Sequence, residues 1–171
     1  MIVDMPVPTI GTDILTSIGA ANTEAHWIPF GKRGVNGMTV TEFFIDLTDL
    51  SSVADDGDVI GDTGEVAGAT LGQYTTAVMG TVIAIEVTCL EAPVAGDPDI
   101  DLYSHATGTL KIDDDASGGT QLIAAGGNWT NGMVKGATAM PTVDDYFYLT
   151  SGAAAAGDYS AGKFIIRIYG S

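Results

Sequence analysis

Hydrophobic and polar positions alternate along three stretches of the chain, residues 39–47, 81–91 and 163–169. Strict alternation is typical of a β-strand that buries one face, because successive side chains of a strand point to opposite sides. β-Branched and aromatic residues, which favour strands, are frequent in all three stretches. The alternation predicts a shared core built from one face of each strand: Phe43, Ile45, Leu47, Ile83, Ile85, Val87, Cys89, Phe164, Ile166 and Ile168.

Weaker signals predict further short strands, at residues 25–30, 99–103, 108–112, 120–124 and 145–150. Asn36 and Gly37 form the dipeptide most typical of a tight hairpin, so residues 31–37 are interpreted as the turn between the first two strands. Glycines and aspartates fill residues 49–77, which predicts a long loop with at most one short helix within residues 66–76.

This succession of strands, with turn residues between them and almost no helix, predicts an all-β fold, either a β-sandwich or a barrel. A jelly-roll-like β-sandwich is favoured because that architecture accommodates long glycine-rich loops. Residues 1–24 match neither strand nor helix periodicity, and Pro6 and Pro8 keep their start extended. They are interpreted as an extended N-terminal arm, either packed on a neighbouring subunit or frayed, before a single domain at residues 25–171.

Composition narrows the function classes. The chain has 171 residues, 46% of them hydrophobic, and carries 22 acidic against 6 basic residues for a net charge of −16. Such a charge repels nucleic-acid phosphates and anionic membranes, so neither is an expected partner. The start of the chain lacks the pattern of a secretory signal peptide, and no apolar run is long enough for a membrane span, which favours synthesis in the cytoplasm.

Motifs for catalysis or for a cofactor are missing from the sequence. There is no Gly-x-Ser-x-Gly, and Ser104 and His105 would point to opposite faces of a strand. A single cysteine cannot build a zinc site, and Cys89 lies on an apolar face, which predicts a buried, unreactive thiol. Neither catalytic residues, nor a metal, nor a cofactor is therefore predicted.

One acidic loop leaves an alternative open. Residues 56–62 begin like a calcium-binding loop, with aspartates at positions 1 and 3 and a glycine at position 6. Position 12, which should be a glutamate, is Ala67. A solvated acidic loop is the favoured interpretation, with calcium bound at the loop or at a subunit contact as the alternative.

Three stretches, residues 81–98 (TVIAIEVTCLEAPVAGDP), 99–104 (DIDLYS) and 146–170 (YFYLTSGAAAAGDYSAGKFIIRIYG), resemble a group of small proteins encoded beside capsid genes in tailed bacteriophages. The match covers about half of the chain, and residues 1–78 have no part in it. The resemblance implies a capsid decoration, or cement, protein with a jelly-roll-like fold. Such a protein forms homotrimers on the outer surface of the major capsid protein lattice, so its expected location is the virion.

Large apolar residues outside the predicted core faces are the candidates for a subunit contact: Trp27, Phe44, Ile165 and Tyr169. A trimer would also cover edge strands that otherwise invite aggregation. The alternative is a carbohydrate- or receptor-binding β-sandwich module of a phage appendage, since jelly rolls often serve as lectins. That alternative depends on analogy between folds alone.

Overall fold

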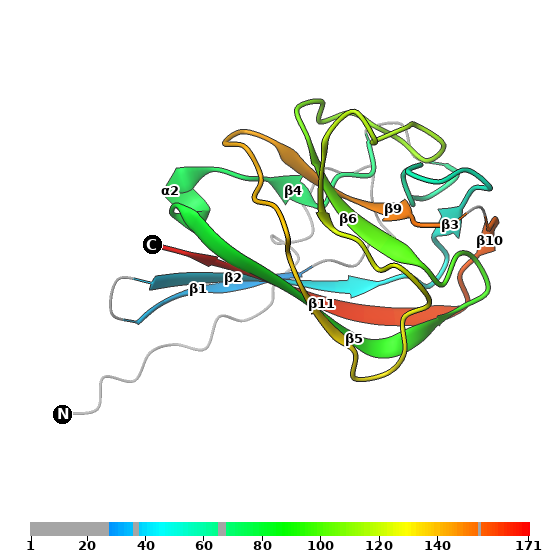
Figure 1. Ribbon diagram of the computed structural model, residues 1–171, viewed down its shortest axis with the longest axis horizontal. Helices are drawn as coiled ribbons and strands as arrows, with labels where there is room; N and C mark the ends of the chain where they lie inside the picture. Colours follow the sequence, from blue (N-terminus) through cyan, green and yellow to red (C-terminus); the bar gives the residue numbers. More distant parts are fainter. Residues whose placement is uncertain (1–27, 36–37, 65–67, 154) are drawn as a thin grey trace.

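The computed structural model describes residues 28–35, 38–64, 68–153 and 155–171, with side chains described from residue 39 onwards. Two antiparallel sheets dominate it (Figure 1). One has five strands in the order β1 (Ile28–Val35), β2 (Met38–Asp46), β11 (Ala161–Gly170), β5 (Val82–Val94) and β8 (Val134–Gly136). The other has four, in the order β4 (Gly72–Gln73), β9 (Tyr146–Ser151), β6 (Ile100–His105) and β7 (Thr120–Ile123). A small third sheet pairs β3 (Ser51–Ser52) with β10 (Gly157–Asp158).

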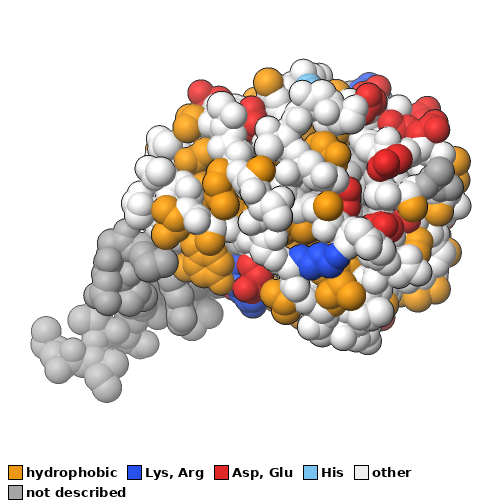
Figure 2. All heavy atoms as spheres, in the orientation of Figure 1, with side chains coloured by type: hydrophobic (Ala, Val, Ile, Leu, Met, Phe, Trp, Pro, Cys, Tyr) orange, Lys and Arg blue, Asp and Glu red, His pale blue; other side chains and the backbone are white. Residues whose placement is uncertain are grey.

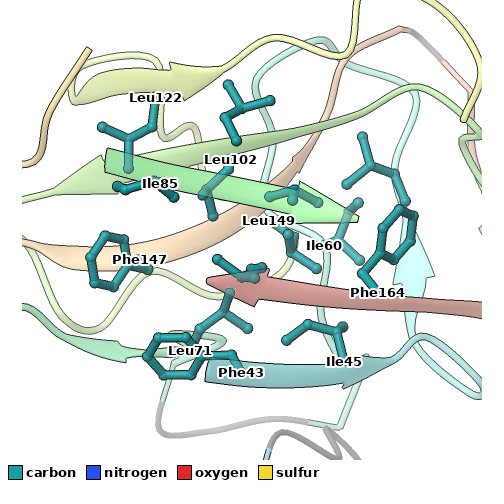
Figure 3. Close-up of a cluster of buried hydrophobic side chains, with 14 of the residues drawn as sticks. Phe43, Ile45, Ile60, Leu71, Ile85, Leu102, Leu122, Phe147, Leu149 and Phe164 are labelled. Carbon is teal, nitrogen blue, oxygen red and sulfur yellow. The ribbon is translucent and has the colours of Figure 1, made fainter. Parts of the chain in front are cut away.

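The hydrophobic core fills the space between the two large sheets (Figure 3). The five-stranded sheet contributes inward side chains of β2, β5 and β11, and the four-stranded sheet contributes those of β6, β7 and β9, such as Leu102, Leu122 and Phe147. In the five-stranded sheet the inner face alternates with a more polar, half-exposed outer face, as expected for packed sheets. The predicted all-β sandwich is thereby confirmed.

The C-terminal strand β11 lies at the centre of the five-stranded sheet. It pairs with β2 through Phe164↔Ile45 and with β5 through Phe164↔Cys89, so the three strands with the clearest alternation are neighbours. Cys89 is completely buried, as predicted, and its burial raises the pKa of the thiol.

Strand β5 departs from the predicted alternation at Ile83, which was expected in the core. Ile83 is 49% exposed, and Val82 is buried in its place. The pairing explains the change, because Tyr169 pairs with Ala84 whereas the next residue, Gly170, pairs with Val82. The extra residue Ile83 forms a β-bulge that turns its side chain outwards.

Other sequence predictions need correction. Residues 31–35 belong to β1 rather than to the predicted turn, and Val35 pairs with Met38, while residues 36–37 lie outside the described residues. Residues 108–112 form turns and irregular backbone instead of a strand, and the Asp114 carboxylate accepts the backbone N–H of Lys111 at 2.8 Å, a local bond that competes with strand pairing there. The short helix α2 spans Thr76–Met79, so it begins at the last residue of the predicted range, 66–76, and lies almost wholly beyond it.

Long loops cover the outer side of β9. Tyr148, which points away from the main core, is fully buried in a second cluster with Val59, Ala69 and Ala116. Its hydroxyl donates a hydrogen bond to the carbonyl of Thr107 at 2.8 Å. The four-stranded sheet is therefore buried on both sides here, and the five-stranded sheet is the one with a half-exposed outer face.

Candidate interaction surface

The side of β2, β11 and β5 that points away from the core is called the outer face below. Its residues follow from the strand pairing, which sets them in rows across the three strands. They are half-buried or exposed: Val40, Glu42, Phe44, Asp46, Lys163, Ile165, Arg167, Tyr169, Ala84, Glu86 and Thr88.

Three of the four predicted interface residues share this face. Ile165 pairs directly with Phe44 on β2, so their Cβ atoms lie about 5 Å apart, and Tyr169 lies four residues further along β11. The row through Ile165 continues over Thr88 to Val134 of β8, which is 52% exposed. The fourth predicted residue, Trp27, and the predicted arm at residues 1–24 lie outside the described residues.

Paired charges separate the apolar rows. The Arg167 Nε donates to Glu42 Oε1 at 2.8 Å and its Nη1 to Glu86 Oε1 at 3.1 Å. The hydrogen bond to Glu42 is the main cause that raises the pKa of Arg167. Lys163 forms a close ion pair with Glu91, and this hydrogen bond raises the pKa of its ammonium group. These half-exposed pairs contribute little stability, but they hold long side chains flat between the apolar rows.

The groups that could suggest catalysis are not brought together. Ser104 is fully buried and donates to Asp145 Oδ2 at 2.9 Å, while His105, on the other face of β6, accepts the Thr107 N–H at its Nδ1. Among the described residues, no three His, Cys, Asp or Glu side chains are placed to hold a metal ion by themselves. No helix within those same ranges is long and apolar enough to cross a membrane.

The space between the sheets offers no room for an organic ligand at the void beside Trp129 and Phe164. This void is lined mostly by apolar side chains and is no larger than about one water molecule. The Trp129 indole N–H is already satisfied by the carbonyl of Ile100 at 2.8 Å. Among the described residues, the outer face is therefore a better candidate for molecular recognition than this void.

Two aspartates at the end of the sandwich are buried as well. Asp97 is fully buried, and Asp101 accepts the Ala125 N–H and the Gln121 side-chain amide. Burial raises the pKa of both carboxyl groups, and the neighbouring charges of Asp99 and Asp56 raise it further. The titratable groups that affect these two carboxyls are thus acidic themselves.

We expect the protein to become more stable as the pH falls from 7 towards the folded-state pKa values of Asp97 and Asp101. Both values lie above the ordinary 3.8, so the folded state binds these protons more tightly than the unfolded state does. This contribution is complete below pH 3.8 and is lost as the pH rises through the folded pKa values. Thermal unfolding at a series of pH values from 4.5 to 7 measures it.

General relief of acidic repulsion would also stabilise the protein on acidification, and variants separate the two causes. Asp101→Asn should flatten the pH profile, because it removes one of the two carboxyl groups that titrate. The fold should tolerate the change, since the Asn carbonyl still accepts the Ala125 N–H and the Gln121 amide can turn to accept from the new NH₂ group. Asp144→Asn, which removes the same charge at an exposed site, should leave the slope unchanged. Equal slopes in all three proteins would contradict the assignment to buried carboxyl groups.

Comparisons with protein-family models, with curated proteins and with solved structures found no match to this chain. A functional conclusion therefore depends on the resemblance of its sequence stretches and on the chemistry of the outer face.

Proposed function

We propose that this chain is a structural protein of a tailed-bacteriophage virion. In this role it binds the outer surface of the major capsid protein lattice and stabilises the shell as a homotrimer with a jelly-roll-like fold. The outer face forms the contact between its subunits.

The direct pairing of Phe44 with Ile165 on the outer face is the observation that carries this proposal. The two side chains form an apolar row between rows of paired charges, and Tyr169 adds an aromatic group on the same face. Mixed surfaces of this kind, with aromatic groups and satisfied charges, are typical of protein–protein interfaces. The stretches that resemble phage proteins contain β5, β6, β9, β10 and β11, and thus supply two of the three strands of the outer face.

Charge distribution favours the outer face over the acidic end of the molecule as the contact between copies. The net charge of −16 makes close approach of two copies costly wherever unpaired carboxylates meet. Figure 2 shows acidic side chains gathered at the end of the molecule where β3 and β10 lie. On the outer face, in contrast, Arg167 and Lys163 are bonded to carboxylates, which reduces the repulsion.

Ile165→Asp tests the proposal. A charge at this position would be buried at the subunit contact, and loss of an anchor residue costs about 2 kcal/mol, or about 30-fold in association. We expect the unchanged protein to sediment as a trimer and to bind purified phage heads that lack it, and the variant to dissociate and lose binding. Circular dichroism shows whether the variant keeps its strands.

Val143→Asp is the matched control, because it also replaces an apolar side chain by a charged one, at an exposed position before β9. It should assemble and bind like the unchanged protein. A monomeric unchanged protein that does not bind heads would refute the proposed role. Equal losses in both variants would instead reject the outer face as the subunit contact.

A further inference from the structure

Two polar side-chain atoms are buried without a hydrogen-bond partner among the described residues: Oδ1 of Asp99 and the hydroxyl oxygen of Thr150. Thr150, on β9, is fully buried, and Asp99 is half-buried with its Oδ1 shielded from solvent. A buried polar atom without a partner is costly, so native proteins almost always satisfy it with a protein group, with water or with an ion. Both atoms therefore point to a bound group.

Strand pairing places the two residues on the same side of the four-stranded sheet, the side that the long loops cover. Asp101 on β6 pairs with Thr150, so their side chains point to one side with Cβ atoms about 5 Å apart. Asp99 lies two residues earlier, on the same side, and its carbonyl accepts the N–H of Gly152 at 2.6 Å. The other neighbour of Thr150 in this row is the apolar Val59. The polar neighbour of the Thr150 hydroxyl across the row is thus the Asp101 carboxylate.

Gly152 leaves a small space between the two carboxylates. A Cβ atom at this position would lie 2.8 Å from Asp99 Oδ1 and 3.0 Å from Asp101 Oδ1, closer than a carbon atom normally approaches oxygen. Ca²⁺, in contrast, binds its oxygen ligands at about 2.3–2.6 Å, so a space bordered by two carboxylate oxygens at this range suits it. The φ of Gly152 is not positive, so the backbone itself does not require glycine here.

The electrostatic environment of this space favours a cation. Burial raises the pKa of Asp101, and the negative charges of Asp99 and Asp56 raise it further. The Asp101 oxygens accept hydrogen bonds from neutral groups, the Ala125 N–H and the Gln121 amide. Within the described part of the chain, no lysine or arginine forms an ion pair with Asp99 or Asp101. The two negative charges therefore lie side by side without a positive charge to offset them.

We propose that Asp99, Asp101 and Thr150 bind one Ca²⁺ ion at this end of the sandwich, with water in its remaining positions. Ca²⁺ takes about 6–8 oxygen ligands in flexible geometry, so two carboxylates and a hydroxyl can serve it together with water. Asp99 Oδ1 and the Thr150 hydroxyl gain the partner that they lack, and the ion offsets the two carboxylates. The partial exposure of Asp99 and Gly152 gives the ion a way in from solvent.

This site is separate from residues 56–62, whose sequence begins like a calcium-binding loop. Its ligands come from the start of β6 and from β9, two strands that are far apart in sequence and paired in the sheet. An ion here would fasten the ends of these strands together. The inference goes beyond the proposed role in the virion, because it concerns the stability of each single subunit.

Thermal unfolding of protein dialysed against EDTA tests the proposal, with CaCl₂ compared with NaCl at equal ionic strength and constant pH. We expect CaCl₂ to raise the melting temperature by about 4 °C more than NaCl, at a concentration about ten times the dissociation constant. An equal rise with NaCl would overturn the proposal, since screening of the net charge alone would then explain the effect.

Asp99→Asn should abolish the difference between CaCl₂ and NaCl, because it removes the charge of the ligand whose oxygen lacks a partner. Asp144→Asn is the matched control: it removes the same charge from an exposed position before β9 and should keep the full response. A response that persists in Asp99→Asn, or that disappears in Asp144→Asn, would overturn the assignment to this site.

Gly152→Ala tests the space without changing any charge. Its methyl group would occupy the position between the two carboxylates, and the half-buried Asp99 side chain can turn aside to admit it, so the variant should fold but lose the response to CaCl₂. Gly136→Ala is the control, because a Cβ at this exposed position on β8 meets only the carbonyl oxygen of Ile85, at 3.9 Å. Equal responses in the two alanine variants would count against the site.

If the variants of the site do not fold, amide chemical shifts of the unchanged protein decide. Shifts on adding CaCl₂ that are confined to residues 97–101, 121–125 and 149–153 support the site. Shifts spread over all acidic loops overturn it, because they would show that Ca²⁺ only collects around the negative surface.

Discussion

Phe164→Ala is expected to lower the free energy of unfolding by about 3–5 kcal/mol, which is typical of a large aromatic residue truncated within a core. Phe164 is buried on the central strand β11 and pairs with Ile45 and Cys89 on its two neighbours. Its ring meets the Trp129 ring edge-on, with centroids 5.3 Å apart. Loss of the side chain leaves a cavity beside the small void that is already present there. Chemical denaturation monitored by tryptophan fluorescence measures the effect.

Ile165→Ala provides the comparison, because the adjacent residue lies on the outer face of the same strand. A half-buried side chain loses less contact, so we expect a cost of about 1 kcal/mol in the dissociated protein. If the two variants lost equal stability, the division of β11 into a core side and an outer side would be wrong.

Asp97→Ala is expected to cost about 3 kcal/mol at neutral pH. The fully buried Asp97 carboxylate accepts the N–H of Asp99 at its Oδ1 and the N–H of Ala153 at its Oδ2, each at 2.9 Å. Alanine would remove both of these hydrogen bonds to a charged acceptor, each of which contributes about 1.5–3 kcal/mol, less at the more exposed Ala153. Denaturant unfolding measures the loss, and hydrogen exchange should show that the amides of Asp99 and Ala153 become less protected.

Asp97→Asn is the control for charge. Asparagine keeps one acceptor oxygen and removes the ionised form that burial disfavours, so its cost should be clearly smaller than that of alanine. If Asp97→Ala left the free energy of unfolding unchanged, these two hydrogen bonds would not be what holds the loops at this end of the sandwich together.

The core of the five-stranded sheet could be predicted because its signal is local. Phe43, Ile45, Ile166 and Ile168 repeat at every second position, and such a repeat needs no knowledge of the partner strand. The same alternation directed Phe44, Ile165 and Tyr169 away from the core. What it could not show is that Phe44 and Ile165 are neighbours, since the β2–β11 register joins residues more than a hundred positions apart.

Features set by distant partners could not be predicted. Ile83 fits the alternation of β5, and only the pairing with β11 reveals the bulge that exposes it. Strand β8 has three residues, too few for a period to be recognised. The sequence marked residues 56–62 as acidic, but it could not show that Asp58 bridges to Asp115, which belongs to another loop. The bulge at Ile83 and the Asp58–Asp115 bridge thus both depend on pairing between segments that are distant in the sequence.

The central place of β11 has a consequence for the newly made chain. Strands β2 and β5 do not pair with each other, and each pairs with β11 along most of its length. Before residues 161–170 are in place, the edges of β2 and β5 that pair with β11 therefore have no strand partner in this sheet. Such edges readily join those of other nascent chains. Pairing of β11 satisfies both edges at once, so a chain in which residues 161–170 are not yet paired is the form most exposed to wrong association.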